Sequence, residues 1–255
     1  MLRILAIGNS FSEDALTYLY DIAKASGEEW ITANLYIGGC PLHLHWENAT
    51  ENRPAYLYTK TGTPSRQASI LEGLLDEPWD IVTLQQSSPY SGMWETYEPY
   101  LSNLSAYVKA YAPDAKQWIH QTWAYEWDSS HEGFTQYEKN QQVMYQRLCS
   151  AYRKAADKLQ APIIPCGDAM QLARQNPLYD KLHGGISLCR DGFHASYTHG
   201  RYLLGAVWFE ALSSKSVVGN TFIPSNQSEH ASIPSPAELD ALQLAAHEAV
   251  TSSAM

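Results

Sequence analysis

The chain has 255 residues, of which 45% are hydrophobic and 17% charged, so it can bury a packed core and is not disordered. This length suits one large domain better than two small ones, and we expect a single domain over residues 1–255. The formal net charge of −10 and the absence of a Lys/Arg cluster disfavour nucleic acid or an anionic membrane as a partner.

The cysteines and the amino-terminus indicate a cellular location. The four cysteines are scattered, without C-x-x-C or zinc-like spacing, which favours reduced core thiols. The chain enters an apolar strand directly, without a signal-peptide pattern, and no apolar run approaches the roughly 18 residues of a membrane span. We therefore expect a cytoplasmic protein, with the reservation that a trimmed leader would leave no trace.

Apolar strand-like runs alternate with helical stretches along the chain. The runs cover residues 2–7, 30–37, 80–85, 117–121 and 162–166. This alternation predicts an α/β fold with a central parallel sheet of about five strands and helices on both faces.

Helical periodicity marks the intervening segments. We expect helices over residues 12–25 and 196–212 and a last one starting at Ser235, where Ser-Pro-Ala-Glu forms a capping box. A long helix after Gly133 carries an apolar stripe that should face the sheet. The stripe consists of Met144, Leu148, Ala151, Tyr152, Ala155 and Leu159. The segment 219–235 is the loosest part of the sequence, and we expect it to wrap the surface.

Ser10 follows the first strand and allows two interpretations. With Glu13 it fits a capping box at the start of a helix, which is a structural role. The same position, between a strand and a helix, is where α/β enzymes keep reactive groups. Because Ser12 is also able to cap the helix, the Ser10 hydroxyl need not do so.

Polar or glycine residues follow three of the predicted strands. They are Ser10, Gly38, Gly39, Gln85 and Gln86. Because the carboxyl ends of parallel strands share one edge of a sheet, we expect these residues to converge there.

A serine nucleophile needs a base, and the base needs a group that orients it. Asp191 and His194 can supply both, because Asp-x-x-His on a turn lets the carboxylate reach one imidazole nitrogen. The alternative is that Asp191 only makes a turn and His194 only enters a helix. The presence of Ser10 favours the triad Ser10, His194 and Asp191.

Acyl transfer also needs donors for the developing oxyanion. The backbone N–H groups of Ser10 and Gly39 and a side-chain amide of Gln85 or Gln86 are the candidates. Gly38 and Gly39 would also suit a simple tight turn.

These residues together resemble the SGNH, or GDSL-type, hydrolase superfamily, over residues 2 to about 212. The matching blocks are Gly8-Asn9-Ser10, Gly39, the Gln85-Gln86 pair and Asp191 to His194. The resemblance implies a flavodoxin-like three-layer α/β/α sandwich and an esterase, since many members act on acetylated glycans.

Two positions depart from the family pattern. Asn9 stands where the family has aspartate, and glutamine replaces the asparagine of the third block, with Gln85 weakly preferred over Gln86. An α/β-hydrolase is disfavoured because the chain lacks a Gly-x-Ser-x-Gly elbow around Ser10.

Aromatic residues near the predicted site indicate the substrate. Aromatic faces pack against sugar rings, so we expect an acylated saccharide as the substrate, most simply an O-acetylated one, with no cofactor. The candidate binding residues are Trp46, Trp94, Trp123 and Tyr125. Core packing of these rings is the alternative, and the oligomeric state is not indicated.

Two other functions stay open. A metal-dependent hydrolase would use His43 and His45 with a carboxylate, although no motif places a third ligand. The candidate carboxylates are Glu47, Asp168 and Asp191. A noncatalytic glycan-binding module would keep Ser10 as a cap, and Asn9 favours it.

Overall fold

The computed structural model of the protein describes residues 1–225 and 232–253. The chain divides into two compact units. Unit 1 contains residues 1–13, 29–122 and 146–163, and unit 2 contains residues 14–28, 123–145 and 164–255. The single domain over residues 1–255 stays a prediction.

A β-sheet is the framework of unit 1. In the described part of the chain it has seven strands, in the order β4-β3-β2-β1-β5-β6-β7. The strands are β1 (Leu2–Gly8), β2 (Trp30–Tyr36), β3 (Tyr56–Lys60), β4 (Thr63–Ala68), β5 (Ile81–Leu84), β6 (Lys116–His120) and β7 (Ile163–Ile164).

The strands expected from the sequence form the central part of this sheet. β1 pairs in parallel with β2 and with β5, and β5 pairs in parallel with β6. The five expected strands are β1, β2, β5, β6 and β7, and numbered among themselves they lie in the flavodoxin-like order 2-1-3-4-5. The predicted fold class, a mostly parallel sheet flanked by helices, is therefore confirmed. The switch point, where the strand order reverses and α/β proteins bind ligands, lies between β1 and β5.

The expected number of about five strands was too low, because an antiparallel hairpin extends the sheet. β3 pairs antiparallel with β2 and with β4, and Gly62 at the connecting turn has φ of +75°. All of β4 except Ala68 is exposed, and the strand is polar and contains Pro64. An edge strand in contact with water needs no apolar pattern, so the sequence carried no clear signal for it.

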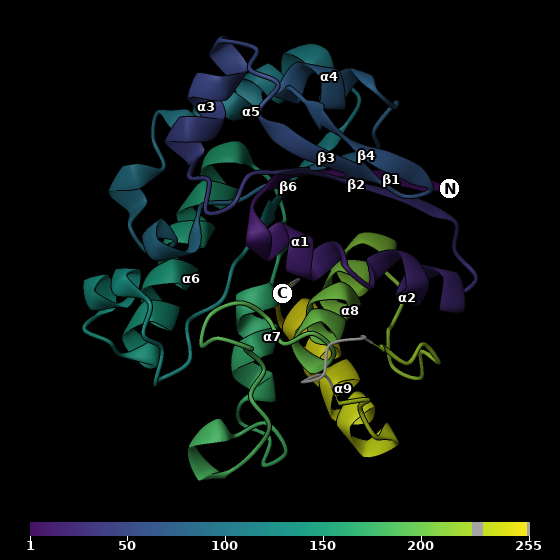
Figure 1. The fold of residues 1–255 in the computed structure, drawn as a ribbon, viewed down its shortest axis with the longest axis vertical. Coiled ribbons are helices and arrows are strands. Elements are labelled where there is room, and N and C mark those ends of the chain that lie inside the picture. Colours follow the sequence, from purple (N-terminus) through teal and green to yellow (C-terminus); the bar gives the residue numbers. More distant parts are fainter. Residues whose placement is uncertain (226–231, 254–255) are drawn as a thin grey trace. The chain divides into compact units, whose positions relative to one another are not determined.

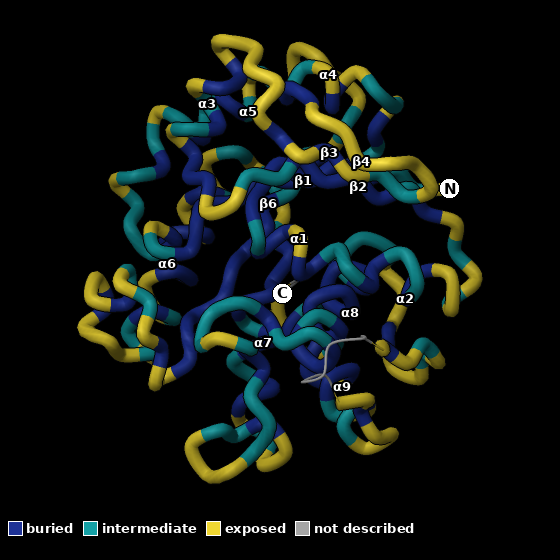
Figure 2. Tube along the Cα trace, in the orientation of Figure 1, coloured by how far each residue is buried: buried dark blue, intermediate teal, exposed yellow. Residues whose placement is uncertain are grey.

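Three α-helices of unit 1 lie together on one side of the sheet (Figure 1). They are α3 (Leu42–Thr50), α4 (Ile70–Leu75) and α5 (Tyr100–Tyr111), and the unit also has the short 3₁₀ helices η1 (Ser88–Tyr90) and η2 (Trp94–Thr96). The inner strand β1 is apolar and buried from Ile4 to Ile7 (Figure 2). Burial on both faces is what a central parallel strand requires.

Unit 2 is helical. It contains α2 (Leu19–Ala25), η3 (Glu132–Tyr137), α7 (Cys166–Ala173), η4 (Lys181–His183), α8 (His199–Ser213) and α9 (Pro236–Ser253). α8 contacts α2, α7 and α9 and is buried almost all round, as an apolar helix at the centre of a bundle should be. No helix in the described residues is long and apolar enough to cross a membrane.

The expected helix over residues 12–25 is two helices, α1 (Ser10–Leu16) and α2. At Tyr18 the backbone has φ of −112° and ψ of 3°, and the phenol hydroxyl donates to the carbonyl of Tyr197 over 2.8 Å. Tyr18 thus bonds to a segment far away in the sequence, and local periodicity does not reveal the break.

The other helices agree with expectation apart from their ends. The helix expected over residues 196–212 is α8, which begins three residues later, and the Ser235–Glu238 capping box closes at 2.7 and 3.4 Å. The long helix is α6 (Gln141–Leu159), whose stripe is buried except for half-buried Leu159. Residues 226–231 of the segment expected to wrap the surface lie outside the described residues.

Candidate active site

The carboxyl end of β1 leads directly into helix α1, and Asn9 is the one residue between the strand and the helix. The Asn9 carbonyl accepts from Glu13 N at 3.1 Å, and its side-chain Oδ1 accepts from Phe11 N at 3.0 Å. Asn9 is therefore the cap of α1. The expected cap at Ser12 is wrong, because the buried Ser12 hydroxyl donates to the Asn9 carbonyl and to Asn34 Oδ1.

Asn9 also ties the ends of three strands together. Its Nδ2 donates to the Cys40 carbonyl, after β2, at 3.2 Å, and its Oδ1 accepts from Gln85 Nε2, after β5, at 2.9 Å. Asn9 is only 1% exposed. The predicted convergence of the segments after β1, β2 and β5 is confirmed, and asparagine is the residue that can both donate to Cys40 and accept from Gln85.

His120, the last residue of β6, extends this network. Its Nδ1 lies 2.7 Å from Gln85 Oε1, and since an amide oxygen only accepts, the imidazole must donate. Burial lowers the pKa of His120 to about 3, so the ring is neutral near pH 7. His120 therefore donates to Gln85, and Gln85 donates to Asn9. This order of donors turns the amide nitrogen of Gln85 towards Asn9, at the carboxyl end of β1.

Gln86, the neighbour of Gln85, hydrogen-bonds to the start of α3 and to the segment after β5. Its Oε1 accepts from Leu42 N at 3.0 Å and from Ser87 N at 2.9 Å. Its Nε2 donates to the carbonyl and to the hydroxyl of Thr96, both at 3.1 Å. Both amide hydrogens of Gln86 are thus bound by Thr96, whereas among the described residues Gln85 Nε2 donates one hydrogen bond, to Asn9.

Gly38 and Gly39 form an exposed turn after β2. Cys40 N donates to the Ile37 carbonyl at 3.2 Å, and Gly39 has φ of +64°, a conformation that favours glycine. The turn that the sequence allowed is therefore present, and in the described part of the chain the N–H of Gly39 donates to no protein group.

Asp191 and His194, the predicted orienting group and base, lie together in unit 2. His194 Nδ1 is 2.7 Å from Asp191 Oδ2, while Asp191 Oδ1 accepts from His194 N at 2.8 Å and from Phe193 N at 3.2 Å. Burial alone would raise the pKa of Asp191, but the hydrogen bonds from His194 outweigh it and hold that pKa below its usual value. Asp191 is thus a carboxylate near neutral pH, as an orienting group for histidine should be.

The loop that carries this pair is fastened from two sides within unit 2. Trp123 Nε1 donates to the Phe193 carbonyl and Glu126 N to the Gly192 carbonyl, both at 2.8 Å. Gly192 has φ of +86°, and a Cβ there would lie only 3.0 Å from Ser129 Cα. Glycine is therefore required at the tip of the loop.

A buried carboxylate anchors the ends of the same loop. Asp14, fully buried in α1, accepts from Arg190 at 3.0 Å and from Arg201 at 2.7 Å. It also accepts from the backbone N–H of Ala195 at 3.0 Å. A buried charge is tolerated when it is paired and hydrogen-bonded to this extent, so Asp14 binds both residues that flank the Asp191 to His194 segment.

The aromatic residues expected to bind substrate differ in burial. Trp123 and Tyr125 are fully buried, and the Tyr125 ring packs against Phe134 and Phe193, so both rings support the interior. Trp46 and Trp94 are half-buried; Trp46 makes an edge contact with Tyr107 and Trp94 stacks on Tyr97.

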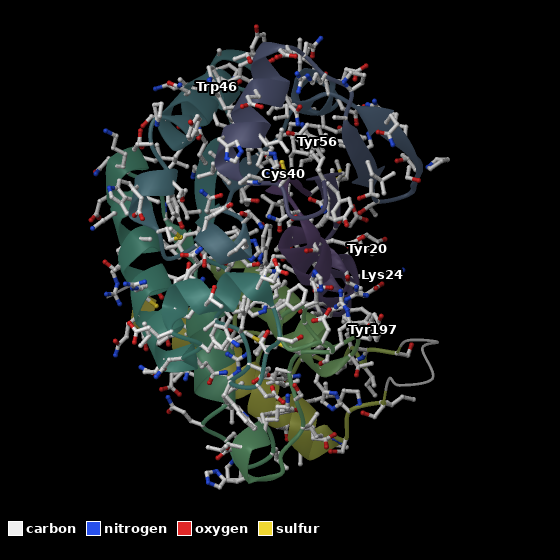
Figure 3. All side chains as sticks on the ribbon, turned by 60° about the vertical axis from the view of Figure 1, so that its left-hand side comes forward. Tyr20, Lys24, Cys40, Trp46, Tyr56 and Tyr197 are labelled. Atoms are coloured by element: carbon white, nitrogen blue, oxygen red, sulfur yellow. The ribbon has the colours of Figure 1, made fainter. Side chains whose placement is uncertain are left out.

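The His-x-His pair considered as metal ligands is divided between surface and interior. His43 is exposed, whereas His45 is buried with Nδ1 2.8 Å from the Tyr56 hydroxyl and 3.5 Å from Cys40 Sγ. Figure 3 labels Cys40 and Tyr56 in this cluster. Among the described residues no group of three or more His, Cys, Asp and Glu side chains is arranged to hold a metal ion. Glu47, Asp168 and Asp191 therefore do not complete a ligand set with this pair.

Some residues of the site had no interpretation from the sequence. His120 lies inside the predicted strand 117–121 and is the last residue of the observed β6, so its place at the strand end was not marked in the sequence. The buried pair of Arg174, in the turn after α7, and Glu126 is 3.3 Å apart and gave no local signal, because it joins segments 48 positions apart in the sequence.

The mostly parallel sheet flanked by helices defines an α/β protein. Residues 3–241 match the family model DUF4886, a domain of unknown function, and the chain belongs to this family. A DUF4886 family protein from Bacteroides uniformis is 37% identical, with a TM-score of 0.89 over 98% of this chain and 95% of that chain.

More distant structures share the fold. A putative GDSL-like lipase from Parabacteroides merdae is 16% identical, with a TM-score of 0.52 over 84% of this chain and 96% of that one. An acetylxylan esterase from Geobacillus stearothermophilus is 13% identical, with a TM-score of 0.52 over 82% and 93%. No curated protein matches the sequence. The SGNH resemblance is thus supported at the level of the fold.

Replacing Asn9 with aspartate should destabilise the protein in a pH-dependent way. An ionised carboxylate at this position would face the Cys40 carbonyl without a hydrogen to donate, at a cost of about 1–3 kcal/mol. The pKa of the new carboxyl should be raised in the folded state, so the deficit relative to wild type should shrink as the pH falls and the carboxyl gains a proton. Urea titrations of both proteins at several pH values measure this difference. A deficit that is constant with pH would contradict the assigned role of the Asn9 amide.

Acid should also destabilise the wild type through two buried histidines. Burial lowers the pKa of His120 to about 3, and burial together with nearby His43 lowers that of His45 to about 3, from an ordinary 6.5. Between pH 3 and pH 6.5 these histidines bind protons in the unfolded chain but not in the folded chain. The free energy of unfolding is therefore highest above about pH 6.5. It should fall towards pH 3 by up to about 1.4 kcal/mol per pH unit for each histidine.

Urea titrations of His120→Gln test this pH dependence, because the variant should show a shallower loss of unfolding free energy in acid. His183→Gln, which changes a histidine with a 76% exposed side chain, is the control and should keep the wild-type slope. Equal slopes in all three proteins would show that His120 can take up a proton in the folded state.

Proposed function

We propose that the protein is a serine esterase in which Ser10 is the nucleophile, His194 the general base and Asp191 the group that orients the base. The observation that carries the proposal is the Asp191–His194 pair. A 2.7 Å contact fixes Nδ1 of the imidazole, and two backbone N–H groups hold the carboxylate in place. This arrangement leaves Nε2 as the nitrogen for a serine proton.

The position of Ser10 is the second support. Ser10 begins α1 at the switch point of the sheet, and Asn9 caps the helix in its place. The hydroxyl is therefore not needed for capping. A nucleophile at the first turn of a helix also gains from the positive end of the helix dipole as negative charge develops nearby.

Helix α1 carries both Ser10 and the residue that anchors the loop of His194. Ser10 and Asp14 lie four residues apart on this one helix and so share a face. Asp14 accepts a hydrogen bond from the backbone of Ala195, the residue after His194.

The proposed oxyanion hole uses the N–H groups of Ser10 and Gly39 and the side-chain amide of Gln85. Gly39 N–H lies in an exposed turn after β2, and Gln85 Nε2 uses one of its two hydrogens for Asn9. Gln86 is a weaker candidate because both of its amide hydrogens are bound by Thr96. His120 acts in this scheme as a positioning residue for Gln85.

The chemistry then follows the serine-hydrolase sequence. His194 takes the proton of Ser10 as the oxygen attacks the ester carbonyl, and the oxyanion donors stabilise the tetrahedral intermediate. The same proton passes to the leaving alcohol, which gives an acyl-enzyme. A water molecule, deprotonated by His194, then releases the acid and restores Ser10. No step requires a cofactor.

The proposed substrate class is an O-acetylated carbohydrate. Half-buried Trp46 and Trp94 offer aromatic surface of the type that packs against sugar rings. A fold shared with an acetylxylan esterase is consistent with this class and does not select the sugar.

Acetate release from acetylated oligosaccharides tests the proposal. We expect Ser10→Ala to lose activity by at least about 10⁴-fold, because the nucleophile is removed. Asp191→Asn should lower kcat by about 10⁴-fold, since the imidazole loses its orienting carboxylate.

Ser87→Ala is the matched control, because Ser87 also follows a strand and its buried hydroxyl has no partner among the described residues. This variant should keep wild-type turnover. Unchanged turnover of Ser10→Ala on a substrate that the wild type cleaves would exclude the proposed nucleophile.

A further inference from the structure

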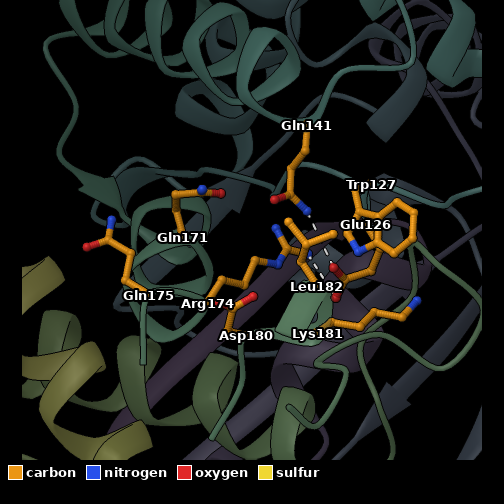
Figure 4. Close-up of a pocket in the computed structure, with 9 residues that line it drawn as sticks. All are labelled: Glu126, Trp127, Gln141, Gln171, Arg174, Gln175, Asp180, Lys181 and Leu182. Carbon is orange, nitrogen blue, oxygen red and sulfur yellow. Dashed lines mark hydrogen bonds and ion pairs between the residues drawn. The ribbon is translucent and has the colours of Figure 1, made fainter. Parts of the chain in front are cut away.

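Unit 2 contains a pocket of about 250 Å³ that the esterase chemistry does not use (Figure 4). This volume is slightly below the roughly 300–1,000 Å³ of drug-sized ligand sites, so it suits a small ligand. Its lining is formed by Glu126, Trp127, Gln141, Gln171, Arg174, Gln175, Asp180, Lys181 and Leu182.

The inner wall of the pocket is a buried ion pair that is held rigidly. Arg174 and Glu126 have side chains 7% and 2% exposed, and Arg174 Nη2 lies 3.3 Å from Glu126 Oε1. Arg174 Nη1 also donates to the Ala124 carbonyl at 3.0 Å, and Gln141 Nε2 donates to the Tyr125 carbonyl at 2.8 Å. The polar groups facing the pocket are therefore fixed in position before any ligand binds.

Among the described residues, two polar atoms of the lining side chains have no hydrogen-bond partner. Arg174 Nε and Gln171 Oε1 are both buried and make no hydrogen bond among the described residues. Both atoms are closed to solvent, so a ligand in the pocket meets the other polar atoms of the lining, such as the side-chain amides of Gln171 and exposed Gln175.

The charge of the lining disfavours an anion. Glu126 and Asp180 oppose Arg174 and Lys181, and Lys181 is further paired with Asp128 at 2.6 Å. Phosphate and carboxylate ligands need an excess of positive charge or a guanidinium that is not already paired. The lining residues provide neither, so a neutral polar ligand is favoured.

An aromatic side chain completes the pocket. Trp127 is 49% exposed, which is unusual for the largest side chain, and it stands beside the Glu126 carboxylate in Figure 4. An indole face next to fixed amide and charged groups is suited to the apolar face and the hydroxyls of a sugar ring.

The pocket is joined to the loop of Asp191 and His194. The backbone N–H of Glu126 donates to the Gly192 carbonyl at 2.8 Å, so one residue forms part of the pocket wall and also fastens that loop. Both features lie within unit 2.

We propose that this pocket binds one ring of a neutral saccharide. Resting on the proposed esterase function, we further assign it as the subsite for a sugar unit of the acylated substrate. Trp127 packs on the ring, and the side-chain amides of Gln171 and Gln175 hydrogen-bond its hydroxyls.

Direct binding measurements test the pocket without any catalysis. Isothermal titration calorimetry of Ser10→Ala with methyl glycosides of xylose, glucose, galactose and N-acetylglucosamine should give saturable binding of at least one. In the same background Trp127→Ala and Gln171→Leu should each weaken that binding by about 10-fold, the equivalent of one lost contact.

Tyr90→Ala and Gln142→Leu are the matched controls, because both side chains are exposed and neither lines the pocket. They should leave the affinity unchanged. Absence of binding by all four sugars, affinities that the pocket variants do not alter, or binding of inorganic phosphate in their place would each overturn the proposal.

Steady-state kinetics separate this proposal from the esterase proposal. In the otherwise wild-type protein, Trp127→Ala should raise KM for an acetylated oligosaccharide about 10-fold, leave kcat unchanged and leave hydrolysis of p-nitrophenyl acetate unaltered. Sugar binding without ester cleavage by the wild type would refute the esterase and retain the pocket. Ester cleavage with an unchanged KM in Trp127→Ala would refute the assigned subsite.

Discussion

The side chain of Asn9 makes the interactions on which the arrangement of the chain after β1, β2 and β5 depends. It caps α1 through Phe11 N, donates to the Cys40 carbonyl after β2 and accepts from Gln85 after β5. Its neighbour Gly8 has to be glycine, because a Cβ there would overlap the Ser12 hydroxyl. One buried amide thus sets where α1 begins, where Ser10 stands and which way Gln85 faces. The residue that departs from the SGNH pattern is the one that this chain uses to join these segments.

Buried charges have the corresponding role in unit 2. Asp14 binds Arg190 and Arg201, and Glu126 binds Arg174, with both carboxylates almost completely buried. Such pairs contribute little net stability compared with apolar packing, but removing one partner is costly, so they specify a geometry. The Asp14 carboxylate also accepts from the N–H of Ala195, and the main-chain N–H of Glu126 donates to the Gly192 carbonyl. Residues of both ion pairs therefore fasten the loop that carries the proposed base.

The sequence predicted the parallel strands and the convergence of their ends because buried apolar runs and the residues after them are local signals. It missed the β3–β4 hairpin, whose edge strand is polar and exposed, and the break at Tyr18, which local periodicity does not mark. It identified Ser10, Asp191 and His194 as candidates through their spacing. The roles of Asn9 and His120 and the Arg174–Glu126 pair depend on contacts between segments distant in the sequence, so no pattern in the sequence revealed them.

In the proposed mechanism His194, held by Asp191, activates Ser10. Reaction with a fluorophosphonate, followed by intact-protein mass spectrometry and peptide mapping, tests this activation most directly because it needs no knowledge of the natural substrate. We expect one adduct, located on Ser10, that forms at least about 100-fold more slowly in His194→Gln and in Asp191→Asn. An adduct on another residue, or labelling of Ser10 at the wild-type rate in both variants, would contradict the activation of Ser10 by His194.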